Sequence, residues 1–86
     1  MLKVIKFSAT WCGPCKALAP VLNEVKGEHP GVTFEDVDVD QNRDYATQFG
    51  ISSVPTVIVM KNGSEVHRFS GVKPKNVINS IINQYK

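Results

Sequence analysis

The sequence is poor in the residues that build metal sites and disulfide frameworks. Its 86 residues hold only two cysteines and two histidines. Both cysteines lie in the stretch Trp11-Cys12-Gly13-Pro14-Cys15-Lys16, whereas His29 and His67 lie far apart in the chain. Because a structural zinc ion needs four protein ligands, this set is too small and we expect no metal. We expect both histidines to be solvated surface residues.

The sequence also lacks an excess of either charge. Ten lysines and arginines and eight aspartates and glutamates give a formal net charge of +2. The two signs are interspersed, whereas a protein that binds nucleic acid or a membrane surface usually shows a basic cluster. We therefore expect partners that are proteins, and neither nucleic acid nor a membrane.

Long hydrophobic runs are absent as well. Lys3 and Lys6 interrupt the apolar residues near the N-terminus, so we expect neither a signal peptide nor a membrane-spanning helix. The expected compartment is the cytoplasm, where thiols are kept reduced and a close cysteine pair is more typical of metal binding or catalysis than of a structural disulfide. A chain of this length predicts one domain, residues 1–86, and we expect it to be a monomer.

The hydrophobic pattern predicts an α/β fold. Asn62-Gly63 indicates a two-residue hairpin turn, and the remaining segments alternate between strand and helix periodicity. The order β-α-β-α-β-β-α predicts a mixed four-stranded sheet flanked by helices, with its first pair of strands parallel and its last pair antiparallel. We expect strands over residues 2–7, 32–39, 54–60 and 65–70. We expect helices from 12 to about 27–31 and from 74 to 85, and between them a short helix that Asp40 or Asn42 caps and that ends at Gly50.

Two cysteines three residues apart at the start of a helix suit electron transfer. Their Cβ atoms lie about 5 to 6 Å apart on a helix and a disulfide needs about 3.5 to 4.5 Å, so the pair can open and close with little movement. The dipole of the helix, worth about 0.3 to 1 kcal/mol, favours a thiolate at Cys12 but lowers a thiol pKa by less than one unit. We expect Cys12, the outermost, to attack a substrate disulfide and Cys15 to resolve the mixed disulfide.

The stretch "WCGPCK" resembles the active-site signature of thioredoxins, and the likeness covers almost the whole chain. It implies the thioredoxin fold and a thiol-disulfide oxidoreductase that reduces protein disulfides. It also implies no cofactor besides the Cys12–Cys15 disulfide, and a flavoprotein thioredoxin reductase as electron donor. Glutathione, as in glutaredoxins, is the alternative reductant, and a binding module with incidental redox chemistry is the alternative role. The matching positions are Phe7, Ala9, Pro20, 40–42, 49–51, 54–56, 61–63 and Gly71.

The resemblance further implies where substrates dock. Pro55 is then a cis proline that faces the cysteines, so that the Val54 backbone can pair with an extended substrate segment. Sequence alone shows only a proline before an apolar run, where cis bonds are uncommon, about 5 to 6% of such bonds. The implied docking surface consists of Trp11, Gly13, Pro14, Val54, Pro55, Thr56, Gly71 and Val72.

Three departures from the thioredoxin pattern carry expectations of their own. The chain resembles a minimal thioredoxin that lacks the N-terminal strand and helix, so strand 32–39 becomes an edge of the sheet. Ser8 replaces an additional tryptophan, which loosens packing beside the motif. Lys6 and Asp36 look exchanged relative to the usual buried aspartate and its lysine. We expect these two to form a partly buried ion pair under the active site that tunes proton transfer, unless Lys6 extends to solvent.

Overall fold

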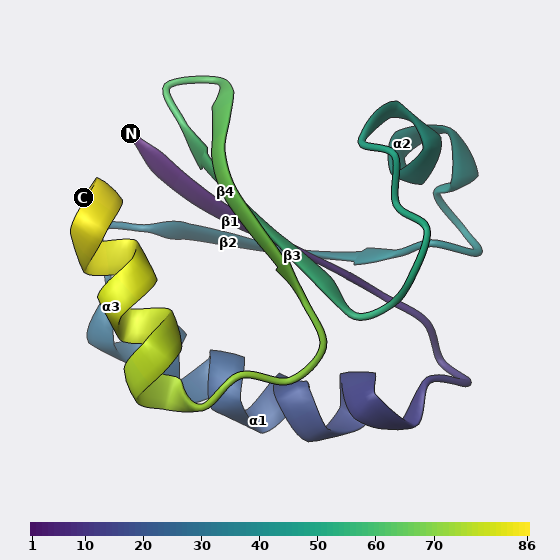
Figure 1. Ribbon diagram of the computed structural model, residues 1–86, viewed down its shortest axis with the longest axis horizontal. Coiled ribbons are helices and arrows are strands. Elements are labelled where there is room, and N and C mark those ends of the chain that lie inside the picture. The colour runs from purple at the N-terminus through teal and green to yellow at the C-terminus, as the bar shows by residue number, and fades with distance from the viewer.

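Four strands form one mixed sheet in the order β2-β1-β3-β4 (Figure 1). The structure is a computed structural model that describes residues 1–86. β1 pairs in parallel with β2 and antiparallel with β3, and β3 pairs antiparallel with β4. The predicted element order is confirmed, as are the strand directions and the edge position of β2. The elements are β1 (Leu2–Ser8), α1 (Gly13–Glu28), β2 (Thr33–Asp38), α2 (Arg43–Gln48), β3 (Thr56–Lys61), β4 (Ser64–Ser70) and α3 (Lys75–Tyr85).

The hairpin between β3 and β4 follows directly from its two turn residues. Asn62 and Gly63 have φ angles of 53° and 86°, the positive values that a two-residue turn between right-twisted strands requires. Asparagine and glycine adopt this region at the least cost. The turn therefore sets Lys61 opposite Ser64 and Met60 opposite Glu65, and an irregularity between Val59 and Met60 shifts the pairing beyond them.

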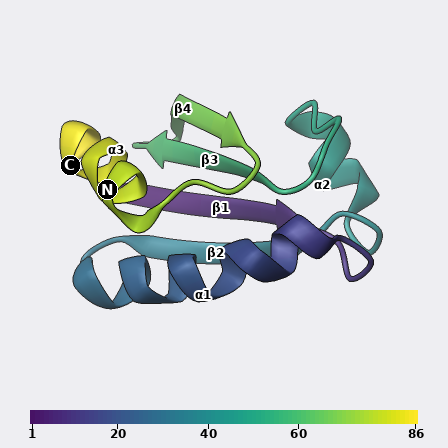
Figure 2. The ribbon, with the colours of Figure 1, turned by 60° about the horizontal axis from the view of Figure 1, so that its bottom comes forward.

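Helices cover both faces of the sheet. α1 and α3 lie together on one face and α2 lies on the other (Figure 1, Figure 2). Because β1 is central, its successive side chains enter two different cores. The core under α1 and α3 includes Leu2, Val4, Leu18, Leu22, Val25, Ile78 and Ile82, and the core under α2 contains Ile5, Phe7, Val37, Ala46 and Ile58.

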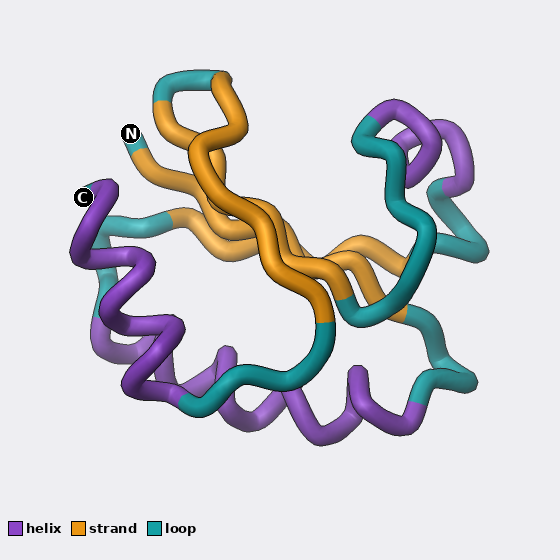
Figure 3. The backbone as a smooth tube through the Cα atoms, viewed as in Figure 1, coloured by secondary structure: helices purple, strands orange, loops and turns teal.

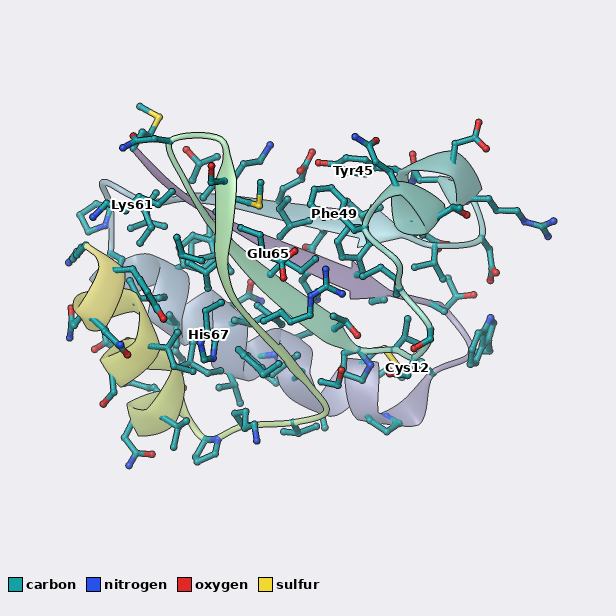
Figure 4. The ribbon with its side chains drawn as sticks, turned by 45° about the horizontal axis from the view of Figure 1, so that its top comes forward. Cys12, Tyr45, Phe49, Lys61, Glu65 and His67 are labelled. Carbon is teal, nitrogen blue, oxygen red and sulfur yellow. A yellow bond between two sulfur atoms is a disulfide. The ribbon has the colours of Figure 1, made fainter.

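Three aromatic rings fix the end of β1 from the α2 side. The ring of Phe7 lies 5.7 Å from that of Tyr45 and 5.6 Å from that of Phe49, and the latter two meet edge to face at 5.3 Å. Figure 4 shows the side chains of Tyr45 and Phe49 close together beside α2. The Tyr45 hydroxyl donates to Glu35 at 3.3 Å. Burial, with a smaller contribution from the Glu35 charge, raises the pKa of Tyr45. Such contacts add about 0.5 to 1.5 kcal/mol per ring pair, so this cluster holds Phe7 in place.

His29 is buried, so the expectation that it is solvated is wrong. Its Nε2 donates to Asn79 Oδ1 at 2.9 Å, and its backbone N–H closes α1 by donating to Lys26. The partner lies fifty residues later in the sequence, which is why local pattern could not reveal it. His67 is half-buried, and its ring lies 5.9 Å from that of Tyr85. Both histidines therefore belong to the packing around α3.

The loops that matter for function gather at one end of the sheet. β1 and β2 both end there, and β3 begins there (Figure 3). The register agrees, because Phe7 lies opposite both Val37 and Thr56. The two chain termini lie at the other end (Figure 1). No helix of the protein is long and apolar enough to cross a membrane.

We predict that Ile82→Ala lowers the free energy of unfolding by about 2 to 5 kcal/mol. Ile82 is fully buried between α3, α1 and the sheet, so its truncation leaves a cavity. Val77→Ala on the exposed side of the same helix serves as the control and should change stability by about 0.5 kcal/mol or less. Equilibrium denaturation in guanidinium chloride measures both. Equal effects of the two substitutions would show that α3 does not pack as described.

Candidate active site

The end of β1 turns directly into the first turn of α1, and Cys12 is the residue at this junction. Its backbone N–H donates to Ala9 O at 3.2 Å, and its extended backbone makes it the N-cap of α1. The Cys12 Sγ accepts a hydrogen bond from the Cys15 backbone N–H at 3.1 Å. Pro14 occupies the first turn, where no backbone donor is needed. The sulfur thus serves as the cap for one of the unpaired N–H groups of the helix.

Cys12 and Cys15 form a disulfide, with Cα atoms 5.3 Å apart. Both residues are buried, each with 4% of its surface exposed. Exposure therefore does not separate the two cysteines, and the expectation that Cys12 is the outermost is not seen in the oxidised protein. Cys12 and Cys15 form a buried cluster with Ala9, and Val39 and Val54 pack against this cluster. What separates the two is position, because Cys12 caps the helix and Cys15 lies inside it.

Trp11 lies on the surface beside the disulfide and is held by the loop that follows β2. Trp11 is 69% exposed, and its Nε1 donates to Asp40 Oδ2 at 2.8 Å. The loop itself is fixed by Asp38, whose Oδ1 accepts from the backbone N–H groups of Asp40 and Gln41 at 2.9 and 3.3 Å. The sequence interpretation missed Asp38 and Asp40. An aspartate followed by polar turn residues is the signal for such a turn, but the reach to Trp11 is not local.

The loop before β3 brings Val54 to the cysteines. The Val54–Pro55 bond is cis, which confirms what the resemblance implied. Val54 packs against Ala9 and the two cysteines. The strand expected from residue 54 begins only at Thr56, whose hydroxyl donates to Ser53 O at 2.7 Å and keeps the loop folded.

Gly71 joins the end of β4 to the same loop. Its N–H donates to Pro55 O at 3.0 Å, and its φ of 83° is a conformation that favours glycine. Val72, next along the chain, is 47% exposed. On the other side of Val54, a hollow of about 190 Å³ separates it from Trp11. Exposed apolar side chains therefore flank the disulfide on this side.

Lys6 and Asp36 form the expected ion pair, with Nζ and Oδ1 3.1 Å apart. Its burial is one-sided, because the Lys6 side chain is 12% exposed and that of Asp36 is 76% exposed. The two residues line a small hollow of about 50 Å³ together with Leu22 and Lys26, and no cysteine lines it. The hollow that the pair lines does not include the disulfide, and a part of the pair in proton transfer stays a prediction. The pair lies beside the C-terminal half of α1.

Ser8 and Lys16 lie on the side of the motif away from Trp11 and Val54. With Asp38 and Cys15 they line a separate hollow of about 200 Å³. A serine in place of a large aromatic side chain accounts for open space at the end of β1. Gly13, Pro14 and Lys16 are all exposed on the first turn of α1.

No three histidine, cysteine, aspartate or glutamate side chains lie close enough to hold a metal ion. The chemistry that the site offers is the making and breaking of the Cys12–Cys15 bond. A thiolate formed at Cys12 keeps the Cys15 N–H as a donor. Cys15 borders the hollow of about 200 Å³ that Ser8, Lys16 and Asp38 also line.

Comparison with known proteins agrees with this geometry. The thioredoxin family model matches residues 1–84. The chain is 44% identical to thioredoxin of Chlamydia muridarum, over 99% of this chain and 83% of that protein. It is 40% identical to thioredoxin of Staphylococcus haemolyticus, over 98% and 82%.

Solved structures give the same result. Thioredoxin of Fasciola hepatica superposes with a TM-score of 0.92 at 40% identity, over 99% of this chain and 81% of that one. A thioredoxin of Nicotiana alata superposes with a TM-score of 0.93 at 40% identity, over 99% and 73%. With its paired cysteines, the chain is a thiol-disulfide oxidoreductase and belongs to the thioredoxin family.

Proposed function

We propose that the protein reduces disulfide bonds of other proteins, with Cys12 as the nucleophile and Cys15 as the resolving thiol. The observation that supports this assignment is the hydrogen bond from the Cys15 N–H to Cys12 Sγ at the N-cap of α1. A donor aimed at the sulfur stabilises its thiolate, and the thiolate is the form that attacks a disulfide.

The reaction proceeds in two exchanges. The Cys12 thiolate attacks one sulfur of the substrate disulfide, so that a Cys12–substrate disulfide forms and the other substrate sulfur leaves as a thiolate and takes up a proton. Cys15 then loses its proton and attacks Cys12 Sγ. The Cys12–Cys15 disulfide forms, the mixed disulfide breaks, and the substrate departs with two thiols. The oxidised pair seen here is the end of this sequence.

Protein substrates would dock on the apolar side of the disulfide. The N–H and C=O of Val54 make no hydrogen bond within the protein, and an unpaired backbone next to Cys12 can pair with an extended segment. Trp11 and Val72 flank it as exposed apolar side chains. The Gly71 N–H donates to Pro55 O and so holds the loop of Val54 and Pro55 next to the end of β4. This surface suits a polypeptide better than a small thiol.

A flavoprotein thioredoxin reductase is the proposed source of electrons. Gly13-Pro14 between the cysteines is the pair found in reducing members of the family, and the family as a whole implies this donor. A reducing role fits the cytoplasm, where thiols are kept reduced. The acidic side chains of β2, an edge strand, discourage edge-to-edge pairing, which supports a monomer.

We predict that insulin reduction separates the roles of the two cysteines. Cys12→Ser should abolish turnover with thioredoxin reductase and NADPH, because no nucleophile remains. Cys15→Ser should instead accumulate a stable disulfide between Cys12 and the substrate, detected as an added mass that dithiothreitol removes. Turnover with glutathione and glutathione reductase but not with thioredoxin reductase would contradict the proposed donor. Absence of turnover with any reductant would favour a binding module instead.

We also predict that Val72→Asp lowers kcat/KM for insulin about tenfold. A buried valine contributes about 1.5 to 3 kcal/mol when apolar surface leaves water, and about 1.36 kcal/mol is tenfold in rate. Val77→Asp is the matched control, because Val77 is also exposed but lies on α3. Reduction of a small aromatic disulfide should change little in either variant. Equal losses in both variants, or a loss with the small disulfide, would contradict docking at Val72.

A further inference from the structure

The hollow beside Cys15 lies on the side of the disulfide that the proposed docking surface does not use. It has a volume of about 200 Å³, and a water molecule occupies about 30 Å³ in the liquid, so it has room for several. None of its lining residues lines the hollow between Trp11 and Val54. The lining residues are Ser8, Ala9, Thr10, Cys15, Lys16, Ala19 and Asp38.

The second exchange of the proposed reaction needs a proton acceptor at this place. Cys15 must lose its proton before it attacks Cys12, because a thiolate and not a thiol is the nucleophile. Lys16 lines the hollow but carries only donors. Asp36, with Lys6, lines the separate hollow beside the C-terminal half of α1. Asp38 is the one carboxylate that lines the same hollow as Cys15.

The Asp38 carboxylate is held in a fixed orientation. Its Oδ1 accepts the backbone N–H groups of Asp40 and Gln41. Its Oδ2 makes no hydrogen bond within the protein, so one oxygen is engaged by the turn and the other is free. The turn is itself tied to the active site, because Asp40 accepts the Trp11 indole N–H.

We propose that Asp38 accepts the proton of Cys15 through water in this hollow when the mixed disulfide is resolved. The inference rests on the proposed resolving role of Cys15. The Cys15 S–H bond breaks, the sulfur keeps the electron pair and bonds to Cys12 Sγ, and the substrate sulfur leaves with the pair of the broken bond. Asp38 holds the proton until solvent or the departing thiolate takes it. Asp38 therefore acts as a relay residue on the face opposite the substrate.

The other charged groups near Cys15 are either cations or already paired. Lys16 lines the hollow as a cation, and Lys6 projects from β1 on the same face of the sheet but is paired to Asp36. Asp40 is engaged by Trp11. Removal of a negative charge near Cys15 would by itself favour its thiolate. A charge effect and a proton-acceptor role of Asp38 therefore predict opposite changes in rate.

The test is stopped-flow reaction of the reduced full chain with an equimolar aromatic disulfide whose coloured thiol leaves as a thiolate. The first release reports attack by Cys12 and the second reports resolution by Cys15. Asp38→Asn removes the proton acceptor but keeps the turn, because an amide oxygen accepts the same two N–H groups. We expect this variant to slow the second phase about tenfold or more below about pH 7 and to leave the first phase within about twofold. Its unfolding midpoint should match that of the parent.

A second variant and two controls complete the design. Ser8→Val fills the hollow without loss of a hydrogen bond, and it should slow the same phase. Asp44→Asn, an exposed residue of α2, should leave both phases unchanged. A second phase that is unchanged or faster in Asp38→Asn overturns the proposal, and so does a slowing seen in Asp36→Asn alone. Cys15→Ser should lack the second phase. If that phase persists there, the resolving role of Cys15 is what fails.

Discussion

The structure depends on one constraint, which is that a central buried strand ends only a few residues before a helix begins. Three residues join Ser8 to Cys12, and the Cys12 N–H already bonds to Ala9 O. The connection leaves the first cysteine no place except the N-cap of α1. Its sulfur then meets the Cys15 N–H at a point where the helix has unpaired donors. The same placement suits the disulfide in the oxidised protein and a Cys12 thiolate in the reduced protein.

The rest of the fold keeps this junction in place. The rings of Tyr45 and Phe49 pack against Phe7 on one face of the sheet, while α1 is packed against α3 on the other. The loop with the cis bond closes over the cysteines and is fastened to Gly71. The surroundings of the disulfide are consequently unequal. Apolar side chains flank it on one side, where substrates would dock, and a hollow that Lys16 and Asp38 help to line borders Cys15 on the other.

Features set by neighbours in the chain could be predicted from the sequence. The Asn62-Gly63 turn, the order of strands and helices, and the cysteine pair at a helix start are all local patterns, and the structure has each of them. Features set by distant contacts could not be predicted in the same way. The burial of His29 depends on Asn79 in another helix. The hydrogen bond from Trp11 to Asp40 also joins residues far apart in the sequence.

For the Lys6–Asp36 pair, the contact could be predicted from the sequence but its burial could not. Strand register made the ion pair predictable, because the two residues face each other across β1 and β2. Which partner would be buried was not predictable, because β2 is an edge strand that leaves Asp36 to solvent while α1 covers Lys6. The carboxylate that borders Cys15 is Asp38, one step further along the same face.

Alkylation of the reduced protein with limiting iodoacetamide, mapped by mass spectrometry over a range of pH, tests the central claim most directly. If the N-cap position activates Cys12, it is modified before Cys15 at every pH, with a midpoint below about 8.5, the ordinary value for a thiol. Equal modification of both cysteines with midpoints near that ordinary value would contradict the account.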